Sequence, residues 1–269
     1  MKASELLKGL QYSVICGDED IEIKEIYNDS RKVGAQGLFF CIVGAKFDGH
    51  EYIKDVTEKG AVCLIVQKDV NPVPGVLIVK VESTRYAMGI ISSNFYGNPS
   101  SKLTVIGITG TKGKTTTTYM IREMLMSAGH KTGLIGTIEA IIGEKKIPAA
   151  NTTPESYTIH QYFAEMVKEG CDCVVMEVSS QGLKLDRTAG IMFDIGVFTN
   201  LEPDHIGPNE HESFEDYLNC KAKLFKQCKV GIVNADDKHT KDILKGAICK
   251  VESYGIAVSY THLTLPTNS

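Results

Sequence analysis

The residues best suited to chemistry in this sequence form a glycine-rich run that ends in lysine and threonine. In LTVIGITGTKGKTTTT, a β-branched stretch is followed by a turn with Gly107, Gly110 and Gly113, and a helix is expected to open at Lys114. Such glycines let backbone N–H groups converge on phosphate oxygens, while the lysine reaches the β- and γ-phosphates. The Thr115 hydroxyl is a ligand for Mg²⁺. The run therefore predicts a site for a nucleoside triphosphate.

The match to the common phosphate-loop pattern GxxxxGK[ST] is incomplete, because Ile108 stands where the first glycine belongs. An ordinary glycine turn is the alternative. The lysine and threonine nevertheless lie between a predicted strand and a threonine-rich helix start, which is the structural context that the motif requires. Phosphate binding is the favoured interpretation.

A second chemical signal is a carboxylate after a buried strand. In CDCVVMEVSSQGLKLDR, the apolar run Cys173–Met176 predicts a parallel strand, and Glu177 follows at its carboxyl end. Open α/β sheets bind ligands at that end of their strands, and a carboxylate there holds Mg²⁺ directly or through water. The alternative is a solvated glutamate.

Other polar stretches have ordinary explanations when the residues are taken alone. The segment NDSRKVGAQG is typical of turn chemistry, and NTTP at 151–154 is typical of a helix start. His205 is compatible with a surface histidine. Lys221 and Lys223 lie in one predicted helix, and nothing in the local pattern distinguishes them.

The elements that must position these residues indicate an α/β protein with two domains. Residues 1–100 alternate short apolar runs with helical or glycine-rich connections, which predicts a small sheet. A helix is expected from residue 84 to Gly97, with the domain junction near residue 100. Residues 101–256 predict a mostly parallel sheet, in which GLIGTIEAII is one strand. After the phosphate loop we expect a helix that packs Tyr119, Met120, Met124 and Leu125 on this sheet.

Composition narrows the classes of function. The chain has 269 residues, 43% hydrophobic content, a formal net charge of −4 and no basic run, so neither nucleic acid nor an anionic membrane is an expected partner. The eight cysteines show no zinc-binding spacing, and MKASELLKGL lacks the apolar segment of a secretory signal. We expect free thiols in a reducing cytoplasm.

The phrases TGTKGKTTT, TN-L-x-x-DH and Y-x-x-x-K-x-x-LF together resemble the Mur ligase family, with Lys112 in place of the family's usual asparagine. The resemblance implies an N-terminal UDP-sugar-binding domain at 1–100 and an incomplete ATP-binding central domain at 101–256. It implies an ATP-dependent ligase of peptidoglycan synthesis that adds a diamino acid to UDP-N-acetylmuramoyl-L-alanyl-D-glutamate through an acyl phosphate. The cofactors of this ligase would be ATP and Mg²⁺, and its partners would be small molecules only. The protein would be a monomer.

The resemblance also assigns roles to individual positions. Metal-binding roles fall on Thr115, Glu177, His205 and Lys221, the last as a carbamylated lysine. Catalytic roles fall on Lys114, Glu177, His205 and Lys221. ATP contacts fall on Gly110, Thr111, Lys112, Gly113, Lys114, Thr115, Thr116, Asn200, Asn234 and Asp237. Contacts to the UDP-sugar substrate fall on Asn28, Ser30, Ala45, Lys46, Phe47, Asn151, Thr152, Thr153, Ser179 and Arg187.

Three departures from the family pattern bear on these assignments. Leu185 stands where other members have a polar contact, and Asn209 and His211, in the variant GPNEH, receive no role. Residues 257–269 have no periodicity and are interpreted as a non-native tail, with the C-terminal ligase domain absent and the chain by itself inactive. The alternatives are a folylpolyglutamate-synthase-like ligase, a non-catalytic nucleotide- and UDP-sugar-binding module, and a P-loop switch ATPase.

Overall fold

The computed structural model describes residues 1–44, 47–204, 206–207 and 210–256. It contains two compact units: unit 1 is Met1–Asn98 with Ser156–Gln161, and unit 2 is Pro99–Glu155 with Tyr162–Ser269. Each unit has its own sheet.

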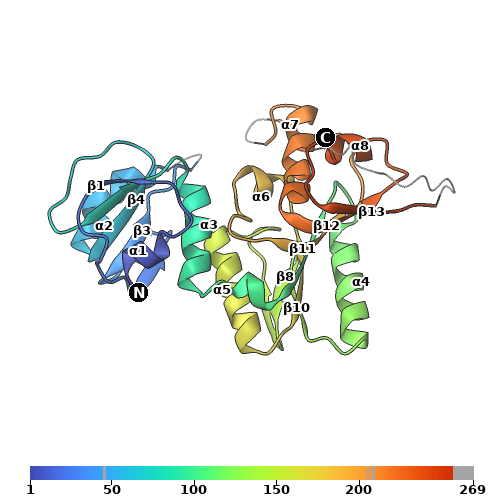
Figure 1. Ribbon diagram of the computed structural model, residues 1–269, viewed down its shortest axis with the longest axis horizontal. Coiled ribbons are helices and arrows are strands. Elements are labelled where there is room, and N and C mark those ends of the chain that lie inside the picture. The colour runs from blue at the N-terminus through green and yellow to red at the C-terminus, as the bar shows by residue number, and fades with distance from the viewer. Residues whose placement is uncertain (45–46, 205, 208–209, 257–269) are drawn as a thin grey trace. The chain divides into compact units, whose positions relative to one another are not determined.

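Unit 1, blue to teal in Figure 1, is built on a five-stranded sheet in the order β1-β5-β4-β3-β2. Strands β2 to β5 are parallel, and β1 pairs with β5 in the antiparallel direction. The strands are β1 (Ser13–Cys16), β2 (Glu25–Tyr27), β3 (Gly37–Phe40), β4 (Ala61–Val66) and β5 (Leu77–Lys80). The helices are α1 (Ala3–Leu6), η1 (Gly49–Tyr52), α2 (Ile53–Glu58) and α3 (Thr84–Phe95).

The central strands β3 and β4 are apolar throughout because both faces of the sheet are covered. One buried cluster joins Leu38 of β3 to Met88 and Ile91 of α3, and the other joins Leu64 of β4 to Val56 of α2. Parallel strands buried on two faces read as continuous hydrophobic runs, as in GLFF and AVCLIV.

The helix expected from residue 84 is α3. Ser83 caps its first turn by accepting a hydrogen bond from the backbone N–H of Tyr86. The helix ends at Phe95, and Gly97 and Asn98 then adopt left-handed φ values of 72° and 52°.

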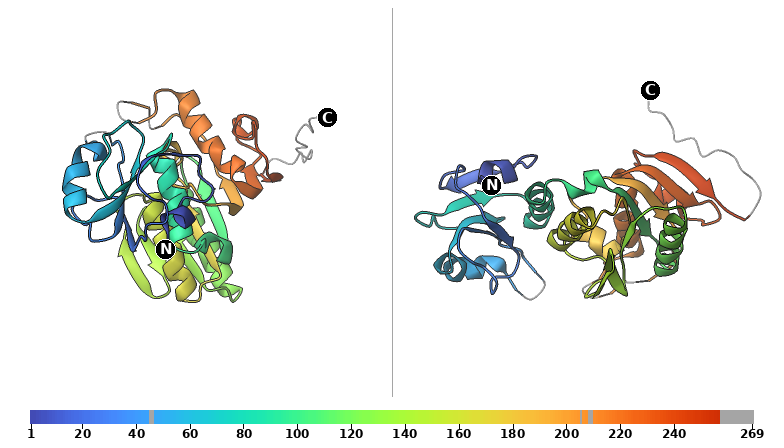
Figure 2. Two further views of the ribbon diagram at one scale, coloured as in Figure 1. Left: turned by 60° about the vertical axis from the view of Figure 1, so that its left-hand side comes forward. Right: turned by 90° about the horizontal axis from the view of Figure 1, so that it is seen from below.

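Unit 2 contains an eight-stranded sheet in the order β13-β12-β11-β6-β10-β7-β8-β9. Its strands are β6 (Thr104–Thr109), β7 (Thr132–Ile135), β8 (Glu139–Ile142), β9 (Lys145–Pro148), β10 (Cys173–Glu177), β11 (Phe193–Phe198), β12 (Cys228–Asn234) and β13 (Lys250–Tyr254). Its helices are η2 (Pro99–Lys102), α4 (Lys114–Ser127), α5 (Ser156–Lys168, which begins among the residues of unit 1), α6 (Ser180–Lys184), α7 (Phe214–Ala222), η3 (Lys223–Lys226) and α8 (Thr240–Ile243). Figures 1 and 2 show α4 and α5 on opposite faces of the sheet.

The centre of this sheet brings three loops to one edge. Strand β6 lies between β10 and β11, parallel to both, with Glu177 level with Ile108 and Phe198 level with Thr109. The loops that follow these three strands therefore meet at their carboxyl ends, where α/β sheets bind ligands. The predicted fold class, an α/β protein with mostly parallel sheets, is confirmed.

Three local predictions were wrong. The stretch GLIGTIEAII forms two antiparallel strands, β7 and β8, with a turn after Ile135. The chain turns beside the Glu177 carboxylate, where a Cβ on Gly136 would lie 2.5 Å from Glu177 Oε1. Gly107 is not part of the phosphate loop but lies within β6, where a Cβ would lie 2.7 Å from the Phe193 ring.

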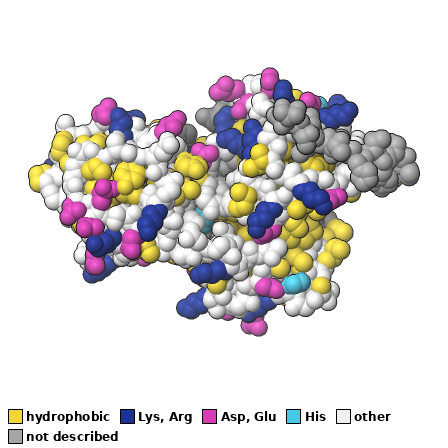
Figure 3. Space-filling view, viewed as in Figure 1, with side chains coloured by type: hydrophobic (Ala, Val, Ile, Leu, Met, Phe, Trp, Pro, Cys, Tyr) yellow, Lys and Arg dark blue, Asp and Glu magenta, His cyan; other side chains and the backbone are white. Residues whose placement is uncertain are grey.

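The third correction concerns α4. Met120 and Met124 are 60% and 69% exposed, whereas Ile121 and Leu125 pack against the sheet. The prediction was therefore right for Leu125, wrong for the two methionines, and missed Ile121. Hydrophobic side chains accordingly gather over α4 on the right of Figure 3.

Two further features concern the cysteines and the helices. All eight cysteines are free thiols. Among the described residues, no helix has both the length and the apolar character needed to cross a membrane.

Candidate functional site

The loop between β6 and α4 has the geometry of a phosphate cradle. Gly110 and Gly113 adopt φ values of +154° and +83°, which side chains disfavour, and α4 begins at Lys114 as the sequence predicts. A Cβ on Gly110 would lie 1.9 Å from Thr199 Oγ1, so only glycine fits there. The first turn of a helix has N–H groups without intrahelical partners, and these are available to an anion at this place.

Two lysines converge on the same part of this loop. Lys114 Nζ donates to the carbonyls of Gly110 and Thr111 at 2.9 and 3.0 Å, and Lys221 Nζ donates to the Gly110 carbonyl at 2.8 Å. Burial lowers the pKa of Lys114. Burial, followed by the charge of Lys114, lowers the pKa of Lys221 well below its ordinary value.

The structure separates the two lysines that the sequence left equivalent. Lys221 is 1% exposed, with its ammonium 4.5 Å from the centre of the Tyr217 ring. The Lys223 side chain is 46% exposed and donates to the Leu183 carbonyl.

Glu177 is buried beside the phosphate loop. Its carboxylate accepts hydrogen bonds from Thr115 Oγ1 at 3.1 Å, the Thr137 backbone N–H at 2.9 Å and Thr137 Oγ1 at 3.0 Å. The Thr115 hydroxyl and the Glu177 carboxylate form an all-oxygen set, which is the ligand chemistry that Mg²⁺ prefers. Sequence reasoning missed Thr137, which faces Glu177 only because the chain turns between β7 and β8.

A cavity of about 370 Å³ opens in unit 2 at Lys114, the first residue of α4. It brings together the phosphate-loop lysine and all the substrate contacts predicted for this unit. Its lining residues are Lys114, Asn151, Thr152, Thr153, Ser179, Ser180, Gln181, Leu185, Arg187, Glu210 and His211.

Hydrogen bonds to Thr153 organise one wall of this cavity. Thr153 Oγ1 donates to the Glu177 carbonyl at 3.0 Å and accepts from the Ser179 backbone N–H at 2.9 Å. Arg187 donates to the Thr153 carbonyl at 2.9 Å and pairs with Glu155 at 2.9 Å. Arg187 Nε is buried and has no partner among the described residues, so it remains available to a bound acceptor.

Three of the residues predicted to contact ATP hold the neighbouring loops together. Asn200 exchanges two hydrogen bonds with the backbone of Lys112, at 2.9 and 3.0 Å. Asn234 Nδ2 donates to the Thr199 carbonyl at 2.9 Å, and Asp237 Oδ2 accepts from the Leu201 N–H at 2.8 Å. These contacts fasten the loop after β11 to the phosphate loop and to the end of β12.

The predicted uridine contacts lie in unit 1. The Ser30 carbonyl accepts from Lys59 Nζ at 3.0 Å, and Phe47 is 71% exposed. Asn28 lies in the loop after β2. Ala45, Lys46 and His205 fall outside the described residues.

His211 lines the cavity, although no sequence pattern had assigned it a role. It is 1% exposed and contacts both Asp216 and Ser180. The only sequence signal is its position in GPNEH, shortly after the TN-L-x-x-DH phrase.

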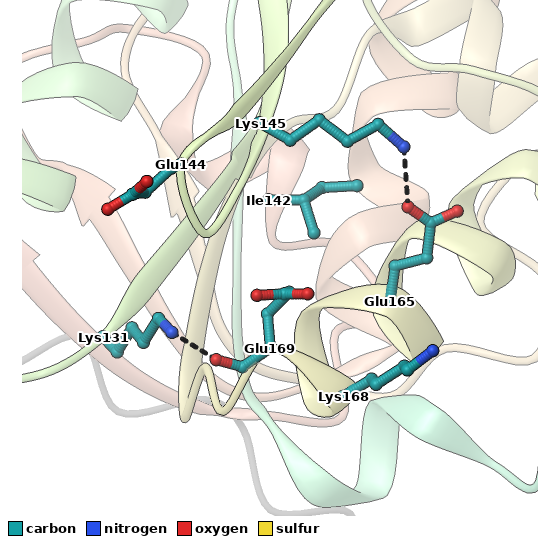
Figure 4. Close-up of a pocket in the computed structure, with 7 residues that line it drawn as sticks. All are labelled: Lys131, Ile142, Glu144, Lys145, Glu165, Lys168 and Glu169. Carbon is teal, nitrogen blue, oxygen red and sulfur yellow. Dashed lines mark hydrogen bonds and ion pairs between the residues drawn. The ribbon is translucent and has the colours of Figure 1, made fainter.

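A second cavity, of about 600 Å³, lies near the beginning of β7 and contains none of the predicted site residues. Figure 4 shows its charged lining, in which Lys145 pairs with Glu165 at 3.1 Å and Lys131 donates to the Glu169 carbonyl. Because it contains none of the predicted site residues, we do not assign it to the functional site.

A mostly parallel sheet with a phosphate loop after its central strand defines a P-loop α/β protein. Residues 108–265 match the model of the Mur ligase middle domain, and residues 22–96 match that of the Mur ligase family catalytic domain. The chain therefore belongs to the Mur ligase family, as its motifs predicted.

Curated relatives are similar to almost the whole chain. It is 48% identical over 256 residues to UDP-N-acetylmuramoyl-L-alanyl-D-glutamate--2,6-diaminopimelate ligase 1 of Clostridium acetobutylicum, which covers 95% of this chain and 53% of that protein. The corresponding ligase of Clostridium perfringens is also 48% identical, over 261 residues, which covers 95% of this chain and 54% of that protein. The chain spans about half the length of the curated relatives it matches.

Solved structures show the same fold. A structure of a UDP-N-acetylmuramoyl-L-alanyl-D-glutamate--2,6-diaminopimelate ligase superposes with a TM-score of 0.77 at 22% identity, covering 95% of this chain and 52% of that one. A MurF ligase of Thermotoga maritima in complex with ADP gives a TM-score of 0.57 at 20% identity, covering 88% of this chain and 51% of that one.

Proposed function

We propose that this chain forms the UDP-sugar-binding and ATP-binding parts of a ligase that adds a diamino acid to UDP-N-acetylmuramoyl-L-alanyl-D-glutamate. The observation that carries the proposal is the cavity that joins Lys114 of the phosphate loop to Thr153, Ser179 and Arg187. The names of the curated relatives supply the substrates, and the ADP complex of the Thermotoga maritima ligase supports a nucleotide at the phosphate loop.

The chemistry needs two anions to be held against their mutual repulsion. Lys114 leaves the carbonyls of its own loop and binds the β- and γ-phosphates, while Arg187 uses its unpaired Nε for the substrate carboxylate. The carboxylate takes the γ-phosphoryl group, and the amine of the diamino acid then displaces phosphate. Thr115 and Glu177 would hold Mg²⁺, which neutralises charge on the phosphates when it is bound.

Lys221 would be carbamylated in the active protein. Reaction with CO₂ forms a C–N bond from an uncharged amine and releases a proton, and burial of Lys221 favours that uncharged form. The product is a carboxylate-like oxygen ligand close to the phosphate loop. His205 would join the same metal site.

The first test is calorimetric titration of the chain with Mg²⁺ and a non-hydrolysable ATP analogue. Loss of hydrogen bonds from a lysine to phosphate predicts that Lys114→Ala weakens binding by about tenfold to a hundredfold. Lys54→Ala is the matched control, because the Lys54 side chain is 89% exposed in unit 1. Equal affinity of the two variants would remove Lys114 from the nucleotide site.

The second test distinguishes the ligase from its rivals. The proposal predicts that the chain binds UDP-N-acetylmuramoyl-L-alanyl-D-glutamate and not folate, and preference for folate would favour a folylpolyglutamate-synthase-like ligase. ATP that remains unconsumed with the dipeptide substrate and diaminopimelate would favour a binding module. We further propose a monomer in the cytoplasm, which gel filtration and cell fractionation would check.

A further inference from the structure

An aspartate, a histidine and a serine form a hydrogen-bonded chain at the wall of the candidate cavity. Asp216 Oδ2 lies 3.0 Å from His211 Nδ1, and His211 Nε2 lies 2.9 Å from Ser180 Oγ. Ser180 and His211 are 4% and 1% exposed, and both line the cavity. These hydrogen bonds connect α7 to the first residue of α6. No sequence pattern had linked the three residues.

The partners of Asp216 fix which atoms carry protons. Lys184 Nζ donates to Asp216 Oδ2 at 2.8 Å, and this contact holds the pKa of Asp216 well below its usual range. An ionised carboxylate accepts only, so His211 Nδ1 must donate to it. Burial lowers the pKa of His211, so its ring carries one proton, which is the one on Nδ1.

The remaining ring nitrogen then determines the state of the serine. His211 Nε2 has no proton and accepts, so Ser180 must donate its single hydroxyl proton to it. Within the part of the chain that the structure describes, His211 is the only hydrogen-bond partner of Ser180 Oγ. The serine hydroxyl is thereby left with lone pairs only for a molecule in the cavity.

We propose that Ser180 is an acceptor subsite that selects an N–H group, an amide or an amine, on the molecule bound in this cavity. The inference deepens the proposed function, and it rests on that function for the identity of the molecule. The two cations that line the same cavity, Lys114 and Arg187, are donors suited to anions. Ser180 differs from them because His211 prevents it from donating.

Two N–H groups of the proposed substrates have this chemistry. One is the amide between alanine and glutamate in the dipeptide substrate, and the other is the ammonium of the diamino acid. If an ester oxygen replaced that amide N–H, its lone pairs would face the lone pairs of the Ser180 hydroxyl and repel them.

The main experiment compares UDP-N-acetylmuramoyl-L-alanyl-D-glutamate with an analogue in which an ester replaces the alanyl–glutamyl amide. We expect the intact chain to bind the amide about three- to tenfold more tightly than the ester. Ser180→Ala should abolish this preference, and His211→Asn should reduce it, because the hydroxyl is then free to rotate and donate. His130→Asn is the matched control: His130 also pairs with an aspartate, Asp172, but does not line the cavity.

The ratio of the two affinities separates recognition from a structural role. If Ser180 only fastens α6 to α7, Ser180→Ala weakens both ligands equally, and this result would overturn the inference. A second arm titrates diaminopimelate into the chain saturated with dipeptide and an ATP analogue. If the intact chain binds the amide and the ester with equal affinity while Ser180→Ala binds diaminopimelate more weakly, the N–H donor is the ammonium of the diamino acid. The proposal is overturned if Ser180→Ala changes neither the amide preference nor the binding of diaminopimelate.

A measurement without any ligand tests the premise directly. The ¹⁵N chemical shifts of the His211 ring near pH 7, assigned with His211→Asn, should show a protonated Nδ1 and a bare Nε2. A proton on Nε2, in a neutral or charged ring, would overturn the inference even if nucleotide binding is normal. If the dipeptide substrate does not bind at all, the proposed function fails, and the ring shifts still decide the state of Ser180.

Discussion

The carboxylate of Glu177 offers a sharp test of the site, because two substitutions there separate stability from metal binding. Glu177→Ala should lower the free energy of unfolding, whereas Glu177→Gln should keep it and weaken only the effect of Mg²⁺. Its two oxygens accept from Thr115 Oγ1, Thr137 Oγ1 and the Thr137 N–H. Glu177→Ala removes all three hydrogen bonds. With a net worth of about 0.5–1.5 kcal/mol each, the free energy of unfolding should fall by about 2–4 kcal/mol.

Glu177→Gln should keep that stability. The amide oxygen can accept from the Thr137 N–H, and the amide nitrogen can donate to the two threonine hydroxyls, which rotate to accept. We therefore expect its unfolding free energy to stay within about 1 kcal/mol of the unmodified chain. The charge is lost, however, and the gain in nucleotide affinity on addition of Mg²⁺ should fall by about tenfold or more.

Urea denaturation and nucleotide titration with and without Mg²⁺ measure both effects. Glu123→Gln is the matched control, because the Glu123 side chain is 66% exposed. The reasoning about hydrogen bonds is refuted if Glu177→Gln is as unstable as Glu177→Ala. The assignment of Glu177 to the metal is refuted if Glu177→Gln retains the full effect of Mg²⁺.

Three further results are expected from other parts of the structure. Gly110→Ala places a methyl group 1.9 Å from Thr199 Oγ1 at a φ of +154°, so the urea midpoint should fall, with a loss of about 2 kcal/mol or more, and nucleotide binding should be lost; an unchanged midpoint would contradict the loop geometry. Cys41 is buried and burial raises its pKa to about 12, so iodoacetamide at pH 8 should alkylate it only after unfolding, and rapid labelling of the folded chain by mass spectrometry would disprove this. The pKa values of His211 and Asp216 are lowered from 6.5 and 3.8, so the folded state binds fewer protons than the unfolded state below those values. Stability should therefore fall as the pH drops below 6.5 and again below 3.8, and His211→Asn should flatten the upper part of a plot of urea midpoint against pH; an unchanged slope would exclude His211 as the source.

Local sequence was sufficient where a residue's role depends on its immediate neighbours. The phosphate loop was predictable because Gly110, Gly113 and Lys114 act through the backbone of one short segment. Glu177 was predictable because four apolar residues before it form a strand, and the carboxyl ends of parallel strands meet at one edge. The α/β class followed from the same alternation of runs and helices.

Helix faces and turns were harder to predict. Met120, Ile121, Met124 and Leu125 are all hydrophobic, so hydrophobic character alone does not tell which of them pack on the sheet. Only Ile121 and Leu125 do so. The turn between β7 and β8 was missed because its cause, the Glu177 carboxylate beside Gly136, lies 41 residues away in the sequence, from 136 to 177.

The sequence by itself thus determined the fold class, the phosphate loop and the carboxylate beside it, since short-range backbone geometry and strand burial specify all three. Family resemblance had chosen Lys221 over Lys223, but only the tertiary structure showed that Lys221 is buried, and only it brought His211 and Asp216 to Ser180. Those properties arise where α6, α7 and the phosphate loop pack together. Burial shifts a pKa, and the contact with Asp216 fixes the proton on His211 Nδ1. Both depend on the surrounding elements, and no local pattern of residues encodes them.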